Sequence, residues 1–249
     1  MDFIYKTEMH CHTAGVSECA SCTPERTVEE YLRYGYSSLV VTDHLNECTF
    51  SNPHIAGAGD RELAEYFLEG YRKTKKAAGE KLNILLGAEI RFPGEGGTDY
   101  LVYGLDESFY TENIGLYRED KYTAGEVIHK AGGLFFQAHP FRFNMKLCED
   151  WLIDGVEVYN GHPTQFSHNE IAELWCAQFS KFLPISGSDH HDLEQCPDAG
   201  ILTAEPISSE ISLIGTLKSR KYRLLRNEGT RQRCMADIML ERGKNVPRD

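Results

Sequence analysis

The segment LFFQAHP (residues 134–140) is a short apolar run that ends abruptly in a histidine and a proline. The segment LVVTDH (residues 39–44) has the same form, and EMHCH (residues 8–12) and LPISGSDHH (residues 183–191) repeat it. Barrel enzymes are built in this way, because their strands bury their bodies and place catalytic residues at their C-terminal ends. Ligands that converge from several strands indicate several metal ions, and such sites are typical of hydrolases, most often of phosphates.

Strand and helix signals alternate along the chain. Strands are predicted at residues 3–10, 38–42, 82–88, 100–105, 134–138, 155–159 and 182–185. Helices are predicted at residues 24–35, 61–78, 123–131, 167–179 and 208–219. Such alternation indicates parallel strands with crossover helices, and six to eight units favour a closed or nearly closed α/β barrel. An open dinucleotide-binding sheet is disfavoured, because no GxGxxG motif opens a helix after the first strand.

Length and composition are those of one globular unit. The chain has 249 residues, 41% of them hydrophobic, and α/β barrels of this length commonly form a single domain. No apolar stretch approaches the roughly 20 residues that a membrane span needs. The N-terminus lacks the pattern of a signal peptide, so we expect a cytoplasmic protein. The polar segment at residues 45–60 is a candidate rim or lid over the site.

The charge pattern limits the partners. The formal net charge is −12, with no basic stripe in the first 200 residues, which disfavours binding of long nucleic acids. An anionic substrate remains compatible with this charge, because bound divalent cations reverse the local sign. A solvated face or a tail contact is expected for the basic residues near the C-terminus, which are Lys218, Arg220, Lys221, Arg223, Arg226, Arg231 and Arg233.

The chain contains eight cysteines. In a chain of this length without a secretory signal, we expect reduced thiols. Cys19 and Cys22 have the spacing of half a zinc site, but no second pair follows at a suitable distance.

Individual residue types suggest roles in a metal site. His10 and His12 are two apart on a strand end, so both imidazoles face the same side. His44 could bind a metal while Asp43 orients it. Glu89 closes the strand at residues 84–88, where a carboxylate can bridge two metals.

The second half of the chain adds further candidates. His139 closes a strand, and the guanidinium of Arg142 could hold a phosphate with two parallel hydrogen bonds. Asp189 and His191 are again two apart and share a side. His162 follows a strand and could contact substrate, although a structural loop histidine is an equally good interpretation.

Taken in order, five motifs resemble those of the polymerase and histidinol phosphatase (PHP) superfamily of metal-dependent phosphoesterases. They are His10-x-His12, Thr42-Asp43-His44, Glu89, His139-Pro140 and Ser188-Asp189-x-His191. The resemblance covers most of the chain and implies a distorted seven-stranded, TIM-like β/α barrel. It also implies a single domain over residues 1–249, with a metal-binding core at about 8–192 and a C-terminal helix and basic tail at 205–249.

The resemblance further implies up to three divalent metals (zinc, manganese or iron). The first metal would be bound by His10, His12, Glu89 and Asp189. The second would be bound by Glu89, His139 and Asp99. The third would be bound by Glu18, His44 and His191. Glu18 and Asp99 depart from the commonest ligands of the family, and more oxygen ligands would shift the preference from zinc toward manganese or iron.

By the same resemblance, a hydroxide held by two metals would attack phosphorus in line with the leaving alkoxide. The third metal and Arg142 would orient the phosphate, with Arg91 as a weaker candidate. His162 or a metal-bound water would protonate the leaving group.

The leading functional hypothesis is a phosphoesterase that hydrolyses a small phosphorylated metabolite and releases phosphate. A histidinol-phosphatase-like enzyme is one version of it. The first alternative is an exonuclease or nucleotide phosphodiesterase, and the second is a non-catalytic metal-binding regulatory module. The sequence leaves the oligomeric state open.

Overall fold

The computed structural model describes residues 2–193, 195–227, 229 and 236. The strands are β1 (Tyr5–Glu8), β2 (Tyr36–Val41), β3 (His44–Leu45), β4 (Asn83–Arg91), β5 (Asp99–Tyr103), β6 (Leu134–Gln137), β7 (Gly155–Asn160), β8 (Leu183–Gly187), β9 (Ala199–Thr203) and β10 (Arg223–Arg226). The helices are α1 (Pro24–Arg33), α2 (Glu47–Phe50), α3 (Asp60–Ala78), α4 (Glu107–Asn113), the 3₁₀ helix Ile114–Arg118, α5 (Lys121–Lys130), α6 (Asn169–Cys176) and α7 (Glu210–Ser219).

The strands form one curved sheet in the order β10-β9-β1-β2-β4-β5-β6-β7-β8, with β3 paired to β4. Strands β1, β2 and β4 to β8 make a nearly closed barrel. Just beyond β1 and β8, Cys11 and His190 form a parallel bridge, while β9 pairs with β1 and packs beside β8. The expected seven-stranded α/β barrel is therefore confirmed, with two further strands at the seam.

The sheet is mixed rather than parallel throughout. Strand β5 runs antiparallel to both of its neighbours, β4 and β6. The reason is the link at residues 92–98, which contains no helix, whereas a parallel connection needs a crossover of a dozen or more residues. As a consequence, the first residue of β5 lies at the same edge as the last residues of β4, and Asp99 faces Arg91 in the register.

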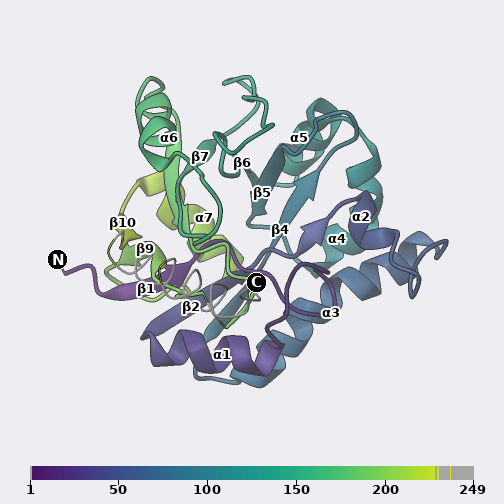
Figure 1. The fold of residues 1–249 in the computed structure, drawn as a ribbon, viewed down its shortest axis with the longest axis horizontal. Helices are drawn as coiled ribbons and strands as arrows, with labels where there is room; N and C mark the ends of the chain where they lie inside the picture. The colour runs from purple at the N-terminus through teal and green to yellow at the C-terminus, as the bar shows by residue number, and fades with distance from the viewer. Residues whose placement is uncertain (1, 194, 228, 230–235, 237–249) are drawn as a thin grey trace, which may run out of the picture.

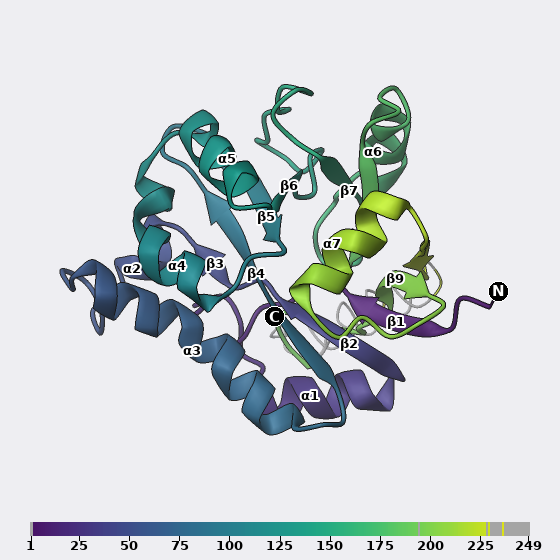
Figure 2. The ribbon, with the colours of Figure 1, turned by 180° about the vertical axis from the view of Figure 1, so that it is seen from behind.

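The helices pack on the outside of the barrel (Figures 1 and 2). Helix α1 begins as predicted, because Thr23 accepts a hydrogen bond from the main-chain nitrogen of Arg26 and Pro24 occupies the first turn. It packs against the amphipathic helix α3, α6 lies beside β7, and α7 crosses near β5. The expected loop at residues 45–60 includes the short helix α2. Helix α4 and strands β9 and β10 have no counterpart in the sequence prediction.

The core has two layers that follow the alternation of side chains along each strand. In β2, Leu39 and Val41 point outward to the helices, whereas Val40 points into the barrel. The barrel interior is filled with apolar side chains that include Leu85, Leu101, Tyr103, Phe136 and Ile185. These apolar side chains lie beneath the polar residues at the mouth of the barrel.

The sequence predicts a solvated face or a tail contact for the C-terminal basic residues, and reduced cysteines. Arg226 pairs with Glu173 at 2.8 Å and Arg220 donates to main-chain oxygens, whereas Arg231 and Arg233 lie outside the described residues. Six described cysteines are free, as expected, but Cys196 is disulfide-bonded. Among the described residues, no helix is long and apolar enough to cross a membrane.

Candidate metal centre

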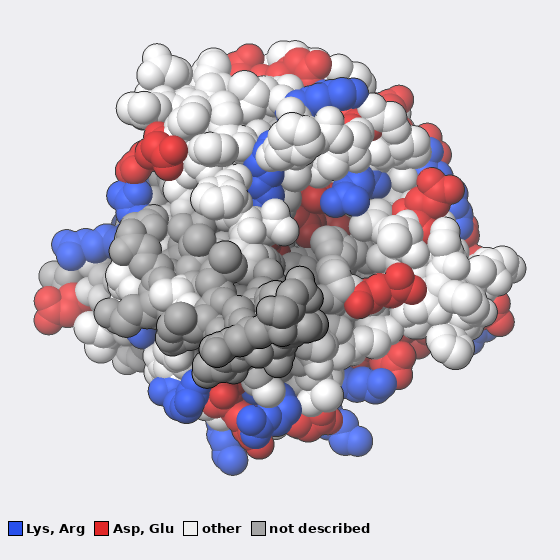
Figure 3. All heavy atoms as spheres, viewed as in Figure 1, with Lys and Arg blue, Asp and Glu red and all other residues white. Residues whose placement is uncertain are grey.

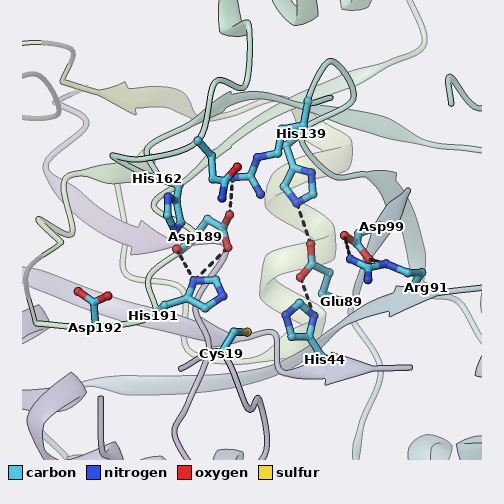
Figure 4. A pocket seen from close by; sticks show the side chains of 12 residues that line it. Cys19, His44, Glu89, Arg91, Asp99, His139, His162, Asp189, His191 and Asp192 are labelled. Carbon is cyan, nitrogen blue, oxygen red and sulfur yellow. Dashed lines mark hydrogen bonds and ion pairs between the residues drawn. The ribbon is translucent and has the colours of Figure 1, made fainter. Parts of the chain in front are cut away.

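Imidazoles and carboxylates from the ends of several strands converge on one cavity (Figure 4). They form three overlapping clusters whose donor atoms lie within 4.8 Å of one another. The members are His10, His12, His44, Glu89, His139, Asp189 and His191, of which His10 and His12 are fully buried and do not line the cavity. The cavity has a volume of about 260 Å³. On the visible face of the molecule, acidic side chains are recessed near the middle and basic side chains lie beside them (Figure 3).

The spacing of the donor atoms fits a divalent metal. Nε2 of His10 lies 3.1 Å from Nε2 of His12, and these nitrogens lie 3.4 and 3.3 Å from Oδ1 of Asp189. The carboxylate of Glu89 lies 3.4 Å from the first nitrogen and 3.3 Å from the second. Four ligands at about 2.0–2.2 Å from a tetrahedral metal are roughly 3.3–3.6 Å apart. His10, His12 and Asp189 therefore surround a space of the right size, and Glu89 lies beside both histidines.

Glu157 on β7 orients one of the histidines. Nδ1 of His10 donates a hydrogen bond to Glu157 at 2.9 Å, which leaves Nε2 with a lone pair toward the cluster. Glu157 also accepts from the main-chain nitrogen of His139 at 2.9 Å and from Asn160 at 3.0 Å. Sequence reasoning missed Glu157, although a single acidic residue within the apolar strand VEVYN was a usable signal.

Asp43 has a different role from the one predicted. It accepts hydrogen bonds from the main-chain nitrogen of Thr13 at 2.7 Å and from Ser17 at 2.8 Å, and Ser17 in turn contacts Nδ1 of His12 at 3.3 Å. Asp43 therefore fixes the loop after β1 and, through Ser17, the ring of His12. His44 instead meets Glu89, with Nδ1 at 3.0 Å from Oε2.

Glu8 ties the ends of β1 and β8 together. Its buried carboxylate accepts hydrogen bonds from the main-chain nitrogens of His10 and Ser188, at 3.0 and 2.8 Å, and from the hydroxyl of Tyr31 at 3.0 Å. Burial raises the pKa of Glu8 to about 7, although these hydrogen bonds oppose the shift. The two strand ends that carry ligands are thus held by one side chain that the sequence analysis did not single out.

Two candidate ligands have unusual backbones. His139 and Asp189 have positive φ angles of 24° and 53°, which cost on the order of 1–3 kcal/mol each in a non-glycine residue. The conformation at Asp189 lets its carbonyl oxygen accept a hydrogen bond from Nδ1 of His191 at 2.8 Å. Nε2 of His191 is left as the ring nitrogen able to bind a metal.

The electrostatics of the cluster call for positive charge. Burial disfavours charged imidazoles, but the pKa of His10 is raised well above its usual value by Asp189, Glu157 and Glu89. Burial likewise opposes a charged His12, yet hydrogen bonds with Asp189 and Glu89 raise its pKa to about 9. The carboxylates are so close together that protons on the histidines offset their charge. A divalent cation bound there would replace those protons.

Two predicted ligands stand apart from the clusters. Glu18 is exposed and borders a neighbouring hollow rather than the main cavity. Asp99 does line the main cavity, but Arg91 binds both of its oxygens at 2.7 Å. A guanidinium therefore contacts both oxygens of Asp99, and the role of Asp99 as a second-metal ligand stays a prediction.

The predicted substrate-binding residues both line the cavity. Nη2 of Arg142 lies 2.5 Å from Oδ2 of Asp189 and 2.7 Å from Oδ1 of Asn160, so this arginine supports a candidate ligand as well as facing substrate. Burial lowers the pKa of His162 to about 4, and the nearby charge of Arg142 acts in the same direction. A neutral His162 does not favour its predicted role as general acid.

Comparisons with known proteins identify the fold. No protein-family model and no curated protein matches the chain. A two-domain protein from Bacteroides vulgatus, described as containing a predicted PHP-like metal-dependent phosphoesterase, aligns over 94% of this chain and 69% of its own, with 18% identity and a TM-score of 0.63. A protein from Bifidobacterium adolescentis, provisionally described as a metal-dependent phosphoesterase, aligns over 87% and 96%, with 17% identity and a TM-score of 0.52.

A third solved structure is an amidohydrolase from Chromobacterium violaceum, described with bound sulfate and no metal. It aligns over 89% of this chain and 98% of its own, with 14% identity and a TM-score of 0.53. At such low identities the likeness is one of fold. The chain has the fold of PHP-like proteins, as the sequence motifs implied, and such a fold does not by itself define a reaction.

Proposed function

We propose that this protein is a metal-dependent phosphoesterase that hydrolyses a small phosphorylated metabolite and releases phosphate. The observation that carries the proposal is the convergence of His10, His12 and Asp189 at distances suited to one metal, with Glu89 within 3.4 Å of both histidines. His139 meets Oε1 of Glu89 at 2.9 Å, and the two form a cluster with His10, which supports a second metal that shares the Glu89 carboxylate. The PHP-like fold of the proteins described as phosphoesterases supports the same reaction class.

Bound divalent metals would lower the pKa of water to near neutrality and stabilise the charge that develops on phosphoryl oxygens. The chain's own residues would position the ligands and the phosphate. Glu157 holds His10 in the tautomer that presents Nε2. Arg142 faces the cavity from one side and fixes Asp189, while Arg91 faces it from another. Both guanidiniums retain N–H donors that could bind a phosphate oxygen.

The size and charge of the cavity favour a small substrate. Its volume of about 260 Å³ is small compared with the roughly 300–1,000 Å³ of typical ligand pockets. Basic and acidic side chains are interspersed on the visible part of this face (Figure 3), rather than gathered in a stripe that would follow a nucleic-acid backbone. We therefore place a phosphomonoester ahead of a polynucleotide. Histidinol phosphate is one member of this class to be tested.

The decisive experiment combines metal analysis with an assay on one sample. Protein purified without chelator is analysed by mass spectrometry for zinc, manganese and iron, and its hydrolysis of p-nitrophenyl phosphate is measured before and after chelation. We expect about two to three bound metals and chelator-sensitive turnover. Glu89→Gln should abolish turnover and keep the fold, as judged by circular dichroism. Bound metal without turnover on phosphomonoesters, diesters or amides would instead favour a non-catalytic metal-binding module.

A further inference from the structure

Cys19 is the one sulfur donor that faces the candidate metal centre within the described part of the chain. It lines the main cavity together with His44 and His191, and in Figure 4 its sulfur lies between these two rings. The thiol is free and exposed.

The histidines near Cys19 form a cluster of their own. Donor nitrogens of His12, His44 and His191 lie within 4.8 Å of one another. The ring of His12 is 4.3 Å from each of the other two rings. Because His12 also belongs to the cluster with His10 and Asp189, His44 and His191 are the members left for a separate metal position.

The loop that carries Cys19 is anchored to one of these histidines. The main-chain nitrogens of Ser21 and Cys22 donate to the carbonyl oxygen of His191, at 2.8 and 3.1 Å. The nitrogen of Ala20 donates to Ser17 at 2.9 Å. These bonds fix the position of Cys19 relative to His191, as a ligand position requires.

Glu18 is not among the residues that line the main cavity. It borders the neighbouring hollow, which Cys19 and His44 line as well, and its charge helps to raise the pKa of Tyr66 on α3, behind the larger effect of burial. The neighbouring residue, Cys19, is therefore the better placed of the two donors.

We propose that the Cys19 thiolate, together with His44 and His191, binds a metal at the position for which Glu18 was predicted. The proposal rests on the proposed metal-dependent function and names a ligand for it. A sulfur and nitrogen donor set selects zinc over manganese or magnesium. The metal preference expected from oxygen ligands is thereby reversed at this position, while the other positions keep their carboxylates.

The test uses cobalt(II), because a cobalt–thiolate bond gives a near-ultraviolet charge-transfer band that nitrogen and oxygen ligands do not produce. The full-length, metal-depleted protein is titrated with cobalt(II) alone, and the near-ultraviolet and visible regions are recorded together. Four proteins are compared, namely the wild type, Cys19→Ser, Glu18→Gln and Cys48→Ser. Cys48 is a matched control, because it is an exposed free thiol on the neighbouring hollow.

We expect the charge-transfer band in the wild type, Glu18→Gln and Cys48→Ser, and its loss in Cys19→Ser. Visible bands without a charge-transfer band in the wild type would overturn the assignment of Cys19 and leave the metal centre intact. A charge-transfer band that survives in Cys19→Ser would overturn the assignment as well. The absence of both kinds of band would contradict the metal-dependent function itself, so the two failures are distinguishable.

Discussion

Arg91 and Asp99 form a two-pronged ion pair at the edge of the candidate metal centre, with Nε–Oδ1 and Nη2–Oδ2 distances of 2.7 Å. The pair exists because β5 is antiparallel to β4, so that the first residue of one strand faces the last residue of the other. Burial and the charge of Glu89 raise the pKa of Asp99, and Arg91 opposes this shift. The ion pair thus places a fixed cation where the sequence motifs implied a metal ligand.

Asp99→Asn should show whether Asp99 holds Arg91 in place or binds a metal. If Asp99 serves to hold Arg91, the variant keeps the metal content of the wild type, and its KM for a phosphomonoester rises because Arg91 is no longer fixed. Metal analysis and steady-state kinetics measure the two effects. Asp189→Asn is the contrasting variant and should lose metal. A loss of one metal from Asp99→Asn would show that the ion pair opens and that Asp99 is a ligand.

Glu157→Gln should weaken metal binding without removing a ligand. The amide cannot accept the hydrogen bond from Nδ1 of His10 as strongly, and outer carboxylates of this kind contribute about 10–100-fold to metal affinity. Competition with a chromophoric chelator measures zinc affinity. Glu170→Gln is the control, since that side chain is 73% exposed on α6. Equal affinities of the two variants would contradict the role given to Glu157.

The sequence motifs identified the histidines because each one follows an apolar strand, a local pattern that a barrel converts into proximity. They did not identify Glu157 or Glu8, because an acidic residue in an apolar strand can indicate a buried carboxylate but does not reveal which groups it binds. The antiparallel direction of β5 could have been predicted from the sequence. Residues 92–98 contain two glycine-rich turns and no helical pattern, which is typical of a hairpin connection.

Glu18 and Cys19 show a different limit. They are adjacent, so family-like spacing cannot decide which one faces the cavity, and the answer depends on the hydrogen bonds that hold the loop to His191. The pairing of Arg142 with Asp189 is likewise a tertiary contact with no signal in the local sequence.

Gly187→Ala should damage the centre through packing alone. A Cβ at Gly187 would collide with the Cβ of His10 and lie 2.8 Å from Oε1 of Glu157, so His10 would have to move. We expect at least tenfold weaker zinc binding and a lower melting temperature. The control is Gly215→Ala on α7, where nothing lies within 4 Å of the added methyl and helix propensity favours alanine by roughly 1 kcal/mol. Unchanged metal binding in Gly187→Ala would show that the site adapts to the methyl group.

Metal binding should strengthen as the pH rises. Without metal, hydrogen bonds to carboxylates outweigh burial and raise the pKa of His12 to about 9. Burial and His12 disfavour a charged His44, but Glu89 raises the pKa of His44 to about 9 as well. Both histidines are therefore protonated at pH 7 in the metal-free protein, and a metal must displace these protons to bind. For each displaced proton the affinity should fall roughly tenfold per pH unit below pH 9.

Zinc titrations at several pH values between 6 and 9, in buffers of different ionisation enthalpy, would measure both the slope and the number of protons released. His44→Ala should flatten the slope by removing one displaced proton. His191→Ala should weaken binding but keep the slope, because burial and His12 lower the pKa of His191 to about 3, so it carries no proton to displace. An affinity independent of pH over this range would mean that the histidines are already neutral before the metal binds, and that the buried carboxylates are balanced in some other way.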